Sequence, residues 1–194
     1  MKKQTAAILG AAAVLAAGGF TAKAVFQPTD AERMPEVAQA DLDAIDALIT
    51  ELYASISGPI GLERDPARMR ACFTENATLT AMQPTTGEYK AFRAGSMAPD
   101  EYIERSFTFL KERGFTESEI GRTLEVYGTI AHAFSAYEGD FTRPDGEMQM
   151  VKGINSIQLI KNDGEWKVFS ILWDQQWPEG RNPVPERYIT AEEG

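Results

Sequence analysis

The chain has 194 residues and a formal net charge of −10 at neutral pH, from 29 acidic and 19 basic side chains. This excess of negative charge repels phosphate backbones and anionic lipid surfaces, so the composition argues against nucleic-acid binding and against attachment to a membrane surface. Cys72 is the only cysteine, which excludes an internal disulfide, and the length suits one domain with an ordinary buried core.

Residues 1–24 have the order of a secretory signal peptide. Two lysines precede an alanine- and leucine-rich run, and small residues on either side of Lys23 end the segment at Ala24. The run is weakly apolar compared with a spanning helix, so we expect cleavage after Ala24 rather than a retained membrane anchor. Cleavage would leave a periplasmic or secreted protein in which residues 25–40 form a flexible spacer.

Three helices are expected before residue 115. The first begins at Asp41, whose carboxylate can cap the first turn by accepting backbone N–H bonds, and a Gly-Pro pair ends it after residue 57. The second is short and begins at Asp65, which is followed by a proline at the first helical position. Residues 77–82 are expected to form a strand that a loop follows. The third helix begins near Pro99, with acidic residues in its first turn and basic residues in its last.

The pattern after residue 115 is that of β-strands. Apolar and polar residues alternate in runs at about 120–126, 129–141, 148–161 and 165–175, and the Asn-Asp-Gly sequence at 162–164 is typical of a hairpin turn. This order of elements indicates an α+β fold, in which three N-terminal helices pack on one face of a curved, mainly antiparallel sheet.

The last strand run is apolar on both of its faces, whereas a sheet with one face in water alternates apolar and polar residues. The outer face therefore needs a cover, and the simplest cover is a second copy of the protein, which predicts a homodimer through the outer sheet face. Residues 178–194 contain several prolines and acidic residues, and we expect them to form a loosely packed tail. The folded domain is then expected to span residues 41–177.

This succession resembles the NTF2-like superfamily, the cone-shaped α+β fold shared by nuclear transport factor 2, ketosteroid isomerases, scytalone dehydratases and SnoaL-like polyketide cyclases. The resemblance lies in the first helix with Tyr53, in DPARMRACFTENATL at residues 65–79 and in IQLIKNDGEWKV at residues 157–168. The stretches AHAFSAYEGDF at 131–141 and GINSIQL at 153–159 are similar to an uncharacterised bacterial branch of exported NTF2-like proteins. The resemblance implies a pocket between the helices and the curved sheet, and often a dimer through the outer sheet face.

The resemblance also suggests candidate catalytic residues. Tyr53 occupies the place where ketosteroid isomerases carry the tyrosine that donates a hydrogen bond to the substrate oxygen. The carboxylate base of those isomerases is missing here, because the matching region reads Thr-Ala-Met at residues 80–82, so this kind of isomerisation is not expected. His132 is a candidate general acid or base, as histidines are in scytalone dehydratases, and Asp174 is the preferred carboxylate. Each of the three side chains is also compatible with a structural or surface role.

Two classes of function stay open. The first is an exported domain that binds a small hydrophobic molecule or a protein partner without chemistry. The second is a cofactor-independent SnoaL-like lyase or isomerase that uses His132 or Asp174 for proton transfer and Tyr53 or Asn155 as hydrogen-bond donor. The expected pocket residues are Tyr53, His132, Phe134, Asn155 and Leu172. No cofactor is expected, because the sequence has no phosphate loop, dinucleotide fingerprint or haem motif, and a single histidine gives no recognisable metal-ligand set.

Overall fold

The computed structural model describes residues 37–85 and 91–189. The expected signal peptide at 1–24 and all of the expected spacer up to residue 36 lie outside the described residues. Within them, no helix is long and apolar enough to cross a membrane. The elements in chain order are α1 (Gln39–Ile56), α2 (Pro66–Ala71), β1 (Phe73–Pro84), β2 (Phe92–Met97), α3 (Pro99–Arg113), β3 (Thr116–Tyr127), β4 (Ile130–Thr142), β5 (Met148–Asn162), β6 (Glu165–Gln175), and the short 3-10 helices η1 (Pro178–Gly180) and η2 (Glu186–Tyr188).

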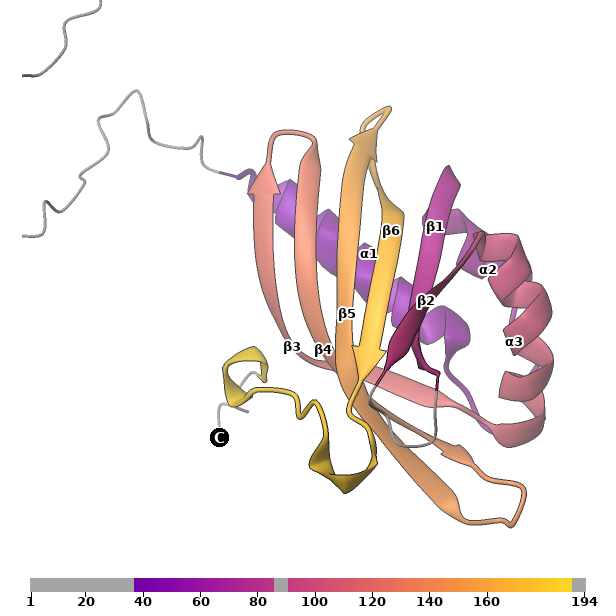
Figure 1. Ribbon diagram of the computed structural model, residues 1–194. Helices are drawn as coiled ribbons and strands as arrows, with labels where there is room; N and C mark the ends of the chain where they lie inside the picture. The colour runs from indigo at the N-terminus through magenta and orange to yellow at the C-terminus, as the bar shows by residue number, and fades with distance from the viewer. Residues whose placement is uncertain (1–36, 86–90, 190–194) are drawn as a thin grey trace, which may run out of the picture. The chain divides into compact units, whose positions relative to one another are not determined.

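The strands form one six-stranded sheet in the order β2-β1-β6-β5-β4-β3. All neighbours are antiparallel except β1 and β6, which run parallel, so the sheet is mixed. Helix α1 crosses one face of the sheet, and α2 and α3 lie near the β1 and β2 edge (Figure 1). The expected α+β fold is confirmed. The prediction that only a loop lies between residue 82 and α3 is partly wrong, because residues 92–97 form the edge strand β2. Pairing with β1 holds β2 in place, whereas its own sequence has no strand pattern.

The start of α1 differs from the expected cap at Asp41. The helix begins at Gln39, after Ala38, and no side chain caps its first turn. The Asp41 carboxylate instead accepts hydrogen bonds from Lys161 Nζ at 2.6 Å and from Trp166 Nε1 at 2.9 Å. These bonds lower the pKa of Asp41, and they tie the first turn of α1 to the β5–β6 hairpin.

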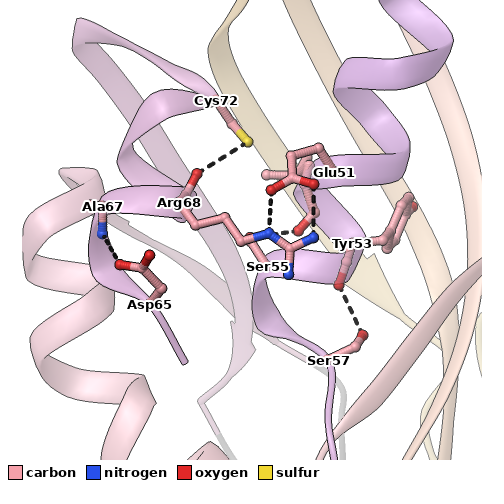
Figure 2. Close-up of polar contacts among 9 residues, drawn as sticks. Glu51, Tyr53, Ser55, Ser57, Asp65, Ala67, Arg68 and Cys72 are labelled. Carbon is pink, nitrogen blue, oxygen red and sulfur yellow. Dashed lines mark hydrogen bonds and ion pairs between the residues drawn. The ribbon is translucent and has the colours of Figure 1, made fainter. Parts of the chain in front are cut away.

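The expected cap of α2 is confirmed, because the Asp65 carboxylate accepts a hydrogen bond from the Ala67 backbone N–H at 2.8 Å (Figure 2). Arg68 on α2 makes an ion pair with Glu51 on α1, so the two helices are also joined at their exposed sides. Cys72 follows α2 and is buried, and this burial raises the pKa of its thiol to about 11. The thiol is therefore protonated at neutral pH, as expected for a structural cysteine.

Arg64 joins the ends of two helices, α1 and α3, through backbone carbonyls. It is 6% exposed, and its guanidinium donates hydrogen bonds at 2.7–3.3 Å to the carbonyl oxygens of Ile56, Gly58, Leu62, Leu110 and Phe115. Ile56 is the last residue of α1, and Leu110 lies in the last turn of α3. The cation thus lies where the negative ends of two helix dipoles meet, and it satisfies carbonyls that these helices leave without partners.

Helix η2 packs on the outer face of the sheet, the face opposite α1 (Figure 1). The ring of Tyr188 in η2 lies 5.0 Å from the ring of Phe134 on β4, in a tilted edge-to-face arrangement. Phe169 and Leu172 on β6 stay 46% and 47% exposed. Residues 178–189, the described part of the segment expected as a loose tail, therefore cover part of the outer face through Tyr188, and Phe169 and Leu172 on β6 stay open to solvent.

Candidate functional site

A cavity of about 200 Å³ lies on the inner face of the sheet, under α1, α2 and α3. Its lining is mostly apolar, and the polar lining residues besides tyrosine are Glu117 on β3, Asn155 on β5 and Gln175 on β6. Such a concave, apolar space with a few converging polar groups is typical of a small-molecule site. The aromatic lining residues are Tyr53, Phe73, Tyr102, Phe109, Phe115, Tyr137, Phe141 and Trp173.

Strand register brings the polar and aromatic lining residues together. Asn155 on β5 lies opposite Trp173 on β6, and Tyr137 on β4 lies opposite Gly153 on β5. Successive side chains of a strand point to opposite faces, so Gly153 and Asn155 share the inner face. A Cβ atom on residue 153 would lie 2.6 Å from the Tyr137 hydroxyl and 2.3 Å from the Asp174 carbonyl oxygen, so glycine at this position makes room for the Tyr137 side chain.

A chain of hydrogen bonds forms the polar end of the cavity. Ser135 Oγ donates to Glu119 Oε1 at 2.6 Å, and the Tyr53 hydroxyl lies 2.7 Å from Ser135 Oγ. Because the single Ser135 proton goes to Glu119, the Tyr53 hydroxyl donates to Ser135. Asn155 Nδ2 donates to the Tyr53 oxygen at 3.1 Å and to Glu117 Oε1 at 3.3 Å. The Tyr53 proton is therefore already engaged within the protein, and Tyr53 is not free to donate to a ligand.

The two glutamates of β3 differ in their electrostatic surroundings. Glu119 lies 3.3 Å from Arg122 Nε and accepts a hydrogen bond from Ser135 Oγ, although burial still raises its pKa. Glu117 has no cationic group within ion-pair distance in the part of the chain that the structure describes, and Asn155 supplies its hydrogen bond. Burial raises the pKa of Glu117 to about 7, and the hydrogen bond from Asn155 opposes this only in part. Glu117 is therefore a carboxyl group that changes its charge near neutral pH inside an apolar cavity.

The tyrosines of the cavity stay protonated at neutral pH. Burial, with the nearby negative charge of Glu117, raises the pKa values of Tyr53, Tyr102 and Tyr137 above the ordinary value. Their hydroxyl groups therefore act as neutral hydrogen-bonding groups, and Glu117 is the group of the lining that titrates near pH 7.

The structure brings together two of the residues expected at the site. Tyr53 and Asn155 line the cavity and are hydrogen-bonded to each other. His132, Phe134 and Leu172 lie on the outer face of the sheet instead, because strand alternation turns them away from the inner-face residues that surround them in sequence. The structure therefore does not bring these three side chains to the cavity with Tyr53.

His132 and Asp174 have local partners away from the cavity. His132 Nε2 lies 3.0 Å from Ser156 Oγ, and its ring lies 6.0 Å from that of Phe134. The Asp174 carboxylate accepts hydrogen bonds from Trp177 Nε1 and from Asn182 Nδ2, both at 3.1 Å. These bonds hold the chain that leaves β6, which is a structural role for Asp174.

Sequence reasoning missed Glu117, although the sequence contains a signal for it. Glu117 and Glu119 are two residues apart in Thr-Glu-Ser-Glu at 116–119, which places both on the same face of a strand. The apolar pattern begins only at Ile120 and therefore predicts a strand that starts after both glutamates, whereas β3 begins at Thr116. Over the two described ranges, no group of three His, Cys, Asp or Glu side chains is placed to hold a metal ion.

The fold is similar to that of solved structures with an NTF2-like fold. One similar solved structure is an NTF2-like superfamily protein from Salmonella enterica serovar Typhimurium, with a TM-score of 0.57, 16% identity, and coverage of 76% of this chain and 100% of that chain. A protein from Kribbella flavida has a TM-score of 0.59 and 14% identity, with 73% and 94% of the two chains covered. A type 2 hexachlorocyclohexane dehydrochlorinase has a TM-score of 0.54 and 11% identity, with 71% and 86% covered. No family model and no curated protein matches the sequence. At these identities the likeness confirms the expected fold, and activity has to be argued from the cavity.

Proposed function

We propose that this protein binds a small, largely apolar molecule in the inner-face cavity. The observation that carries the proposal is the combination of an aromatic lining with one converging polar cluster, formed by Glu117, Asn155 and the Tyr53 oxygen. An apolar molecule gains free energy by leaving water for such a lining, and the polar cluster would fix its orientation. The proposal places the ligand among Tyr53 and Asn155, and away from His132, Phe134 and Leu172.

Filling the cavity should abolish this binding. Val151 lines the cavity from β5, and Val151→Trp would place an indole in the space that the ligand needs. We expect the wild-type protein to gain thermal stability from small neutral aromatic molecules such as phenol and indole, by about 2.7 kcal/mol at 100 times the Kd, and the variant to gain none. Differential scanning fluorimetry and isothermal titration calorimetry measure both effects.

Met150→Trp is the matched control for this experiment. Met150 is the neighbouring residue on β5, is 58% exposed and does not line the cavity, but it lines a second, open cleft together with Val151. Ligand binding that survives Met150→Trp and is lost in Val151→Trp supports the cavity. Equal losses in both variants would place the ligand in the open cleft, and binding that Val151→Trp leaves unchanged would contradict the proposal.

A second candidate function is proton transfer within the same cavity, by a cofactor-independent lyase or isomerase. The observation that favours it is the Glu117 carboxyl group, whose pKa of about 7 suits a general acid or base at neutral pH. The hexachlorocyclohexane dehydrochlorinase with the same fold is an enzyme by its name. In this candidate Glu117 takes the role first considered for His132 or Asp174. Exchange of a carbon-bound proton for deuterium in a panel of small ketones, followed by NMR and lost in Glu117→Gln, would favour it over binding alone.

We also propose the homodimer first expected from the apolar outer face. Phe169 and Leu172 stay exposed on β6 beside the part of the face that Tyr188 covers, and an apolar strip of this kind favours association. A charge in the strip should oppose it, because the carboxylate would have to leave water at the interface. Sedimentation velocity should therefore give a dimer for the wild type and a monomer for Leu172→Glu; a wild-type monomer at all concentrations would contradict the proposal.

A further inference from the structure

We infer that the ligand of the inner-face cavity is a small organic cation, whose ammonium group lies against the Glu117 carboxylate and the surrounding aromatic rings. This inference rests on the proposed function and adds the chemical class of the ligand.

The described lining of the cavity contains an acidic side chain and no basic one. Among residues 37–85 and 91–189, Glu117 is the ionisable carboxyl group that lines the cavity, and no lysine or arginine of these ranges lines it with Glu117. A carboxylate in an apolar cavity is unfavourable unless a positive charge or several donors compensate it, and here the protein supplies one amide hydrogen bond at 3.3 Å. The neighbouring Glu119, in contrast, has Arg122 beside it. A cationic ligand would provide the partner that Glu117 lacks, whereas an anionic ligand would be repelled.

The aromatic side chains favour a cation as well. Tyr53, Tyr102, Tyr137 and Trp173 surround the polar end of the cavity, and the rings of Tyr102 and Trp173 meet edge to face with centroids 6.3 Å apart. Two rings in that arrangement present surfaces of different orientation to the same space. The electron-rich faces of tryptophan and tyrosine attract organic ammonium groups, and such aromatic sites with a nearby carboxylate recognise alkylated ammonium ions.

The net charge of the chain supports the same class of ligand. With 29 acidic and 19 basic side chains, the protein attracts cations at long range and disfavours the approach of anions. A neutral apolar molecule would gain from the aromatic lining alone and would leave the Glu117 carboxylate without a partner. The cation is therefore the class that satisfies the lining and the carboxylate together.

Binding of a cation and ionisation of Glu117 must favour each other. The groups that face Glu117 are Tyr53 from α1, Tyr102 from α3, Tyr137 from β4 and Asn155 from β5, with Glu119 on its own strand beside Arg122. The three tyrosines stay neutral near pH 7, so the charge of the cavity follows Glu117. Cation affinity should then rise as the pH rises from 6 to 8, by up to about tenfold per pH unit below the pKa. A neutral ligand that accepts a hydrogen bond from the protonated Glu117 carboxyl group would show the opposite trend.

The test compares cations with neutral molecules of the same shape. Isothermal titration calorimetry on the full chain at pH 8 would measure the Kd of three cations and their neutral counterparts. The pairs are choline and 3,3-dimethylbutan-1-ol, tetramethylammonium and 2,2-dimethylpropan-1-ol, and phenethylamine and 2-phenylethanol. We expect each bound cation to have at least a tenfold lower Kd than its neutral counterpart, and this advantage to disappear in Glu117→Gln while the neutral ligand keeps its affinity. Glu125→Gln, which changes an exposed glutamate on the same strand, should keep the advantage.

The outcomes separate this inference from the proposed function. If neutral molecules bind as tightly as the cations and Val151→Trp blocks both, the ligand class is wrong and the binding cavity stands. If cations bind equally well to the wild type and to Glu117→Gln, the inference is overturned. If no cation and no neutral molecule binds, both the inference and the proposed function fail. Circular dichroism at each pH checks that the variants are folded.

Discussion

Replacing Arg64 with alanine should lower the free energy of unfolding by at least about 3 kcal/mol, the largest effect that we expect from an exchange outside the cavity. The guanidinium donates to five backbone carbonyls, and four of them, those of Ile56, Gly58, Leu110 and Phe115, belong to the ends of α1 and α3 and to the residues that follow them. Alanine removes all these donors. The Gly58 and Phe115 carbonyls would keep the backbone N–H bonds that they accept from each other, whereas the Ile56 and Leu110 carbonyls would lose a donor at a site where Arg64 is only 6% exposed. A buried carbonyl without a partner costs about 1–3 kcal/mol.

Urea unfolding followed by circular dichroism would measure this loss. Arg70→Ala is the matched control, because Arg70 is a surface arginine whose ion pair with Asp100 is solvent-exposed. Exposed ion pairs contribute about 0–1 kcal/mol, so the control should unfold close to the wild type. Arg64→Lys should lie between the two, because an ammonium group has three donors and cannot span five carbonyls. A loss for Arg64→Ala no larger than that of the control would show that Arg64 does not hold these helix ends.

The predictable part of the fold is the part that local patterns determine. The 3.6-residue period of α1, the Asp-Pro start of α2 and the Asn-Asp-Gly turn between β5 and β6 each depend on residues close in sequence, and all three lie where they were expected. Strand β2 depends on a partner instead. Its central Ala, Gly and Ser residues have no strand pattern of their own, and pairing with β1 makes them a strand.

The site was predictable only in part, for a related reason. Period-2 alternation shows which residues of a strand share a face, but it does not show which face the helices cover. His132 and Ser135 lie on opposite faces of β4, and both faces of that strand are apolar enough to be the inner one. Tyr53 and Asn155 were expected at the pocket and lie there, whereas the histidine and Asp174 do not. Arg64 belongs to no motif, because its role comes from helix ends that only the folded chain brings together. The spacing of Glu117 and Glu119 indicates a shared strand face, but the burial of Glu117 arises only in the folded chain.

Replacing Glu117 with glutamine should change the pH dependence of stability. Burial raises the pKa of Glu117 from an ordinary value of 4.5 to about 7, so the folded protein holds the proton more tightly than the unfolded chain does. Between these pH values the native state binds more protons, and stability therefore falls as the pH rises. The total loss is about 3 kcal/mol, since one pKa unit corresponds to about 1.4 kcal/mol, and it is complete above pH 8.

Glutamine keeps the shape and the hydrogen-bonding capacity of the side chain and cannot ionise. We therefore expect Glu117→Gln to match the wild type near pH 4.5 and to be more stable by about 3 kcal/mol at pH 8, as measured by urea unfolding of ligand-free protein from pH 4.5 to 9. Glu125→Gln, with the same exchange at an exposed position of β3, should follow the wild-type curve. Equal curves for all three proteins would mean that the Glu117 carboxyl group is well hydrated when the protein is folded.

A cation bound in the cavity should reduce this effect of pH on stability. The ionised carboxylate destabilises the empty protein, but it becomes the favourable partner of an ammonium group once the ligand is bound. Wild-type protein with a saturating cation should therefore lose less stability from pH 6 to 8 than the empty protein does, whereas Glu117→Gln should show the same flat curve with and without the cation. The Glu117 carboxylate thus has two opposite effects: it lowers the stability of the empty protein, and it would make the cavity selective for cations. Such a trade-off between stability and function is common at buried polar sites.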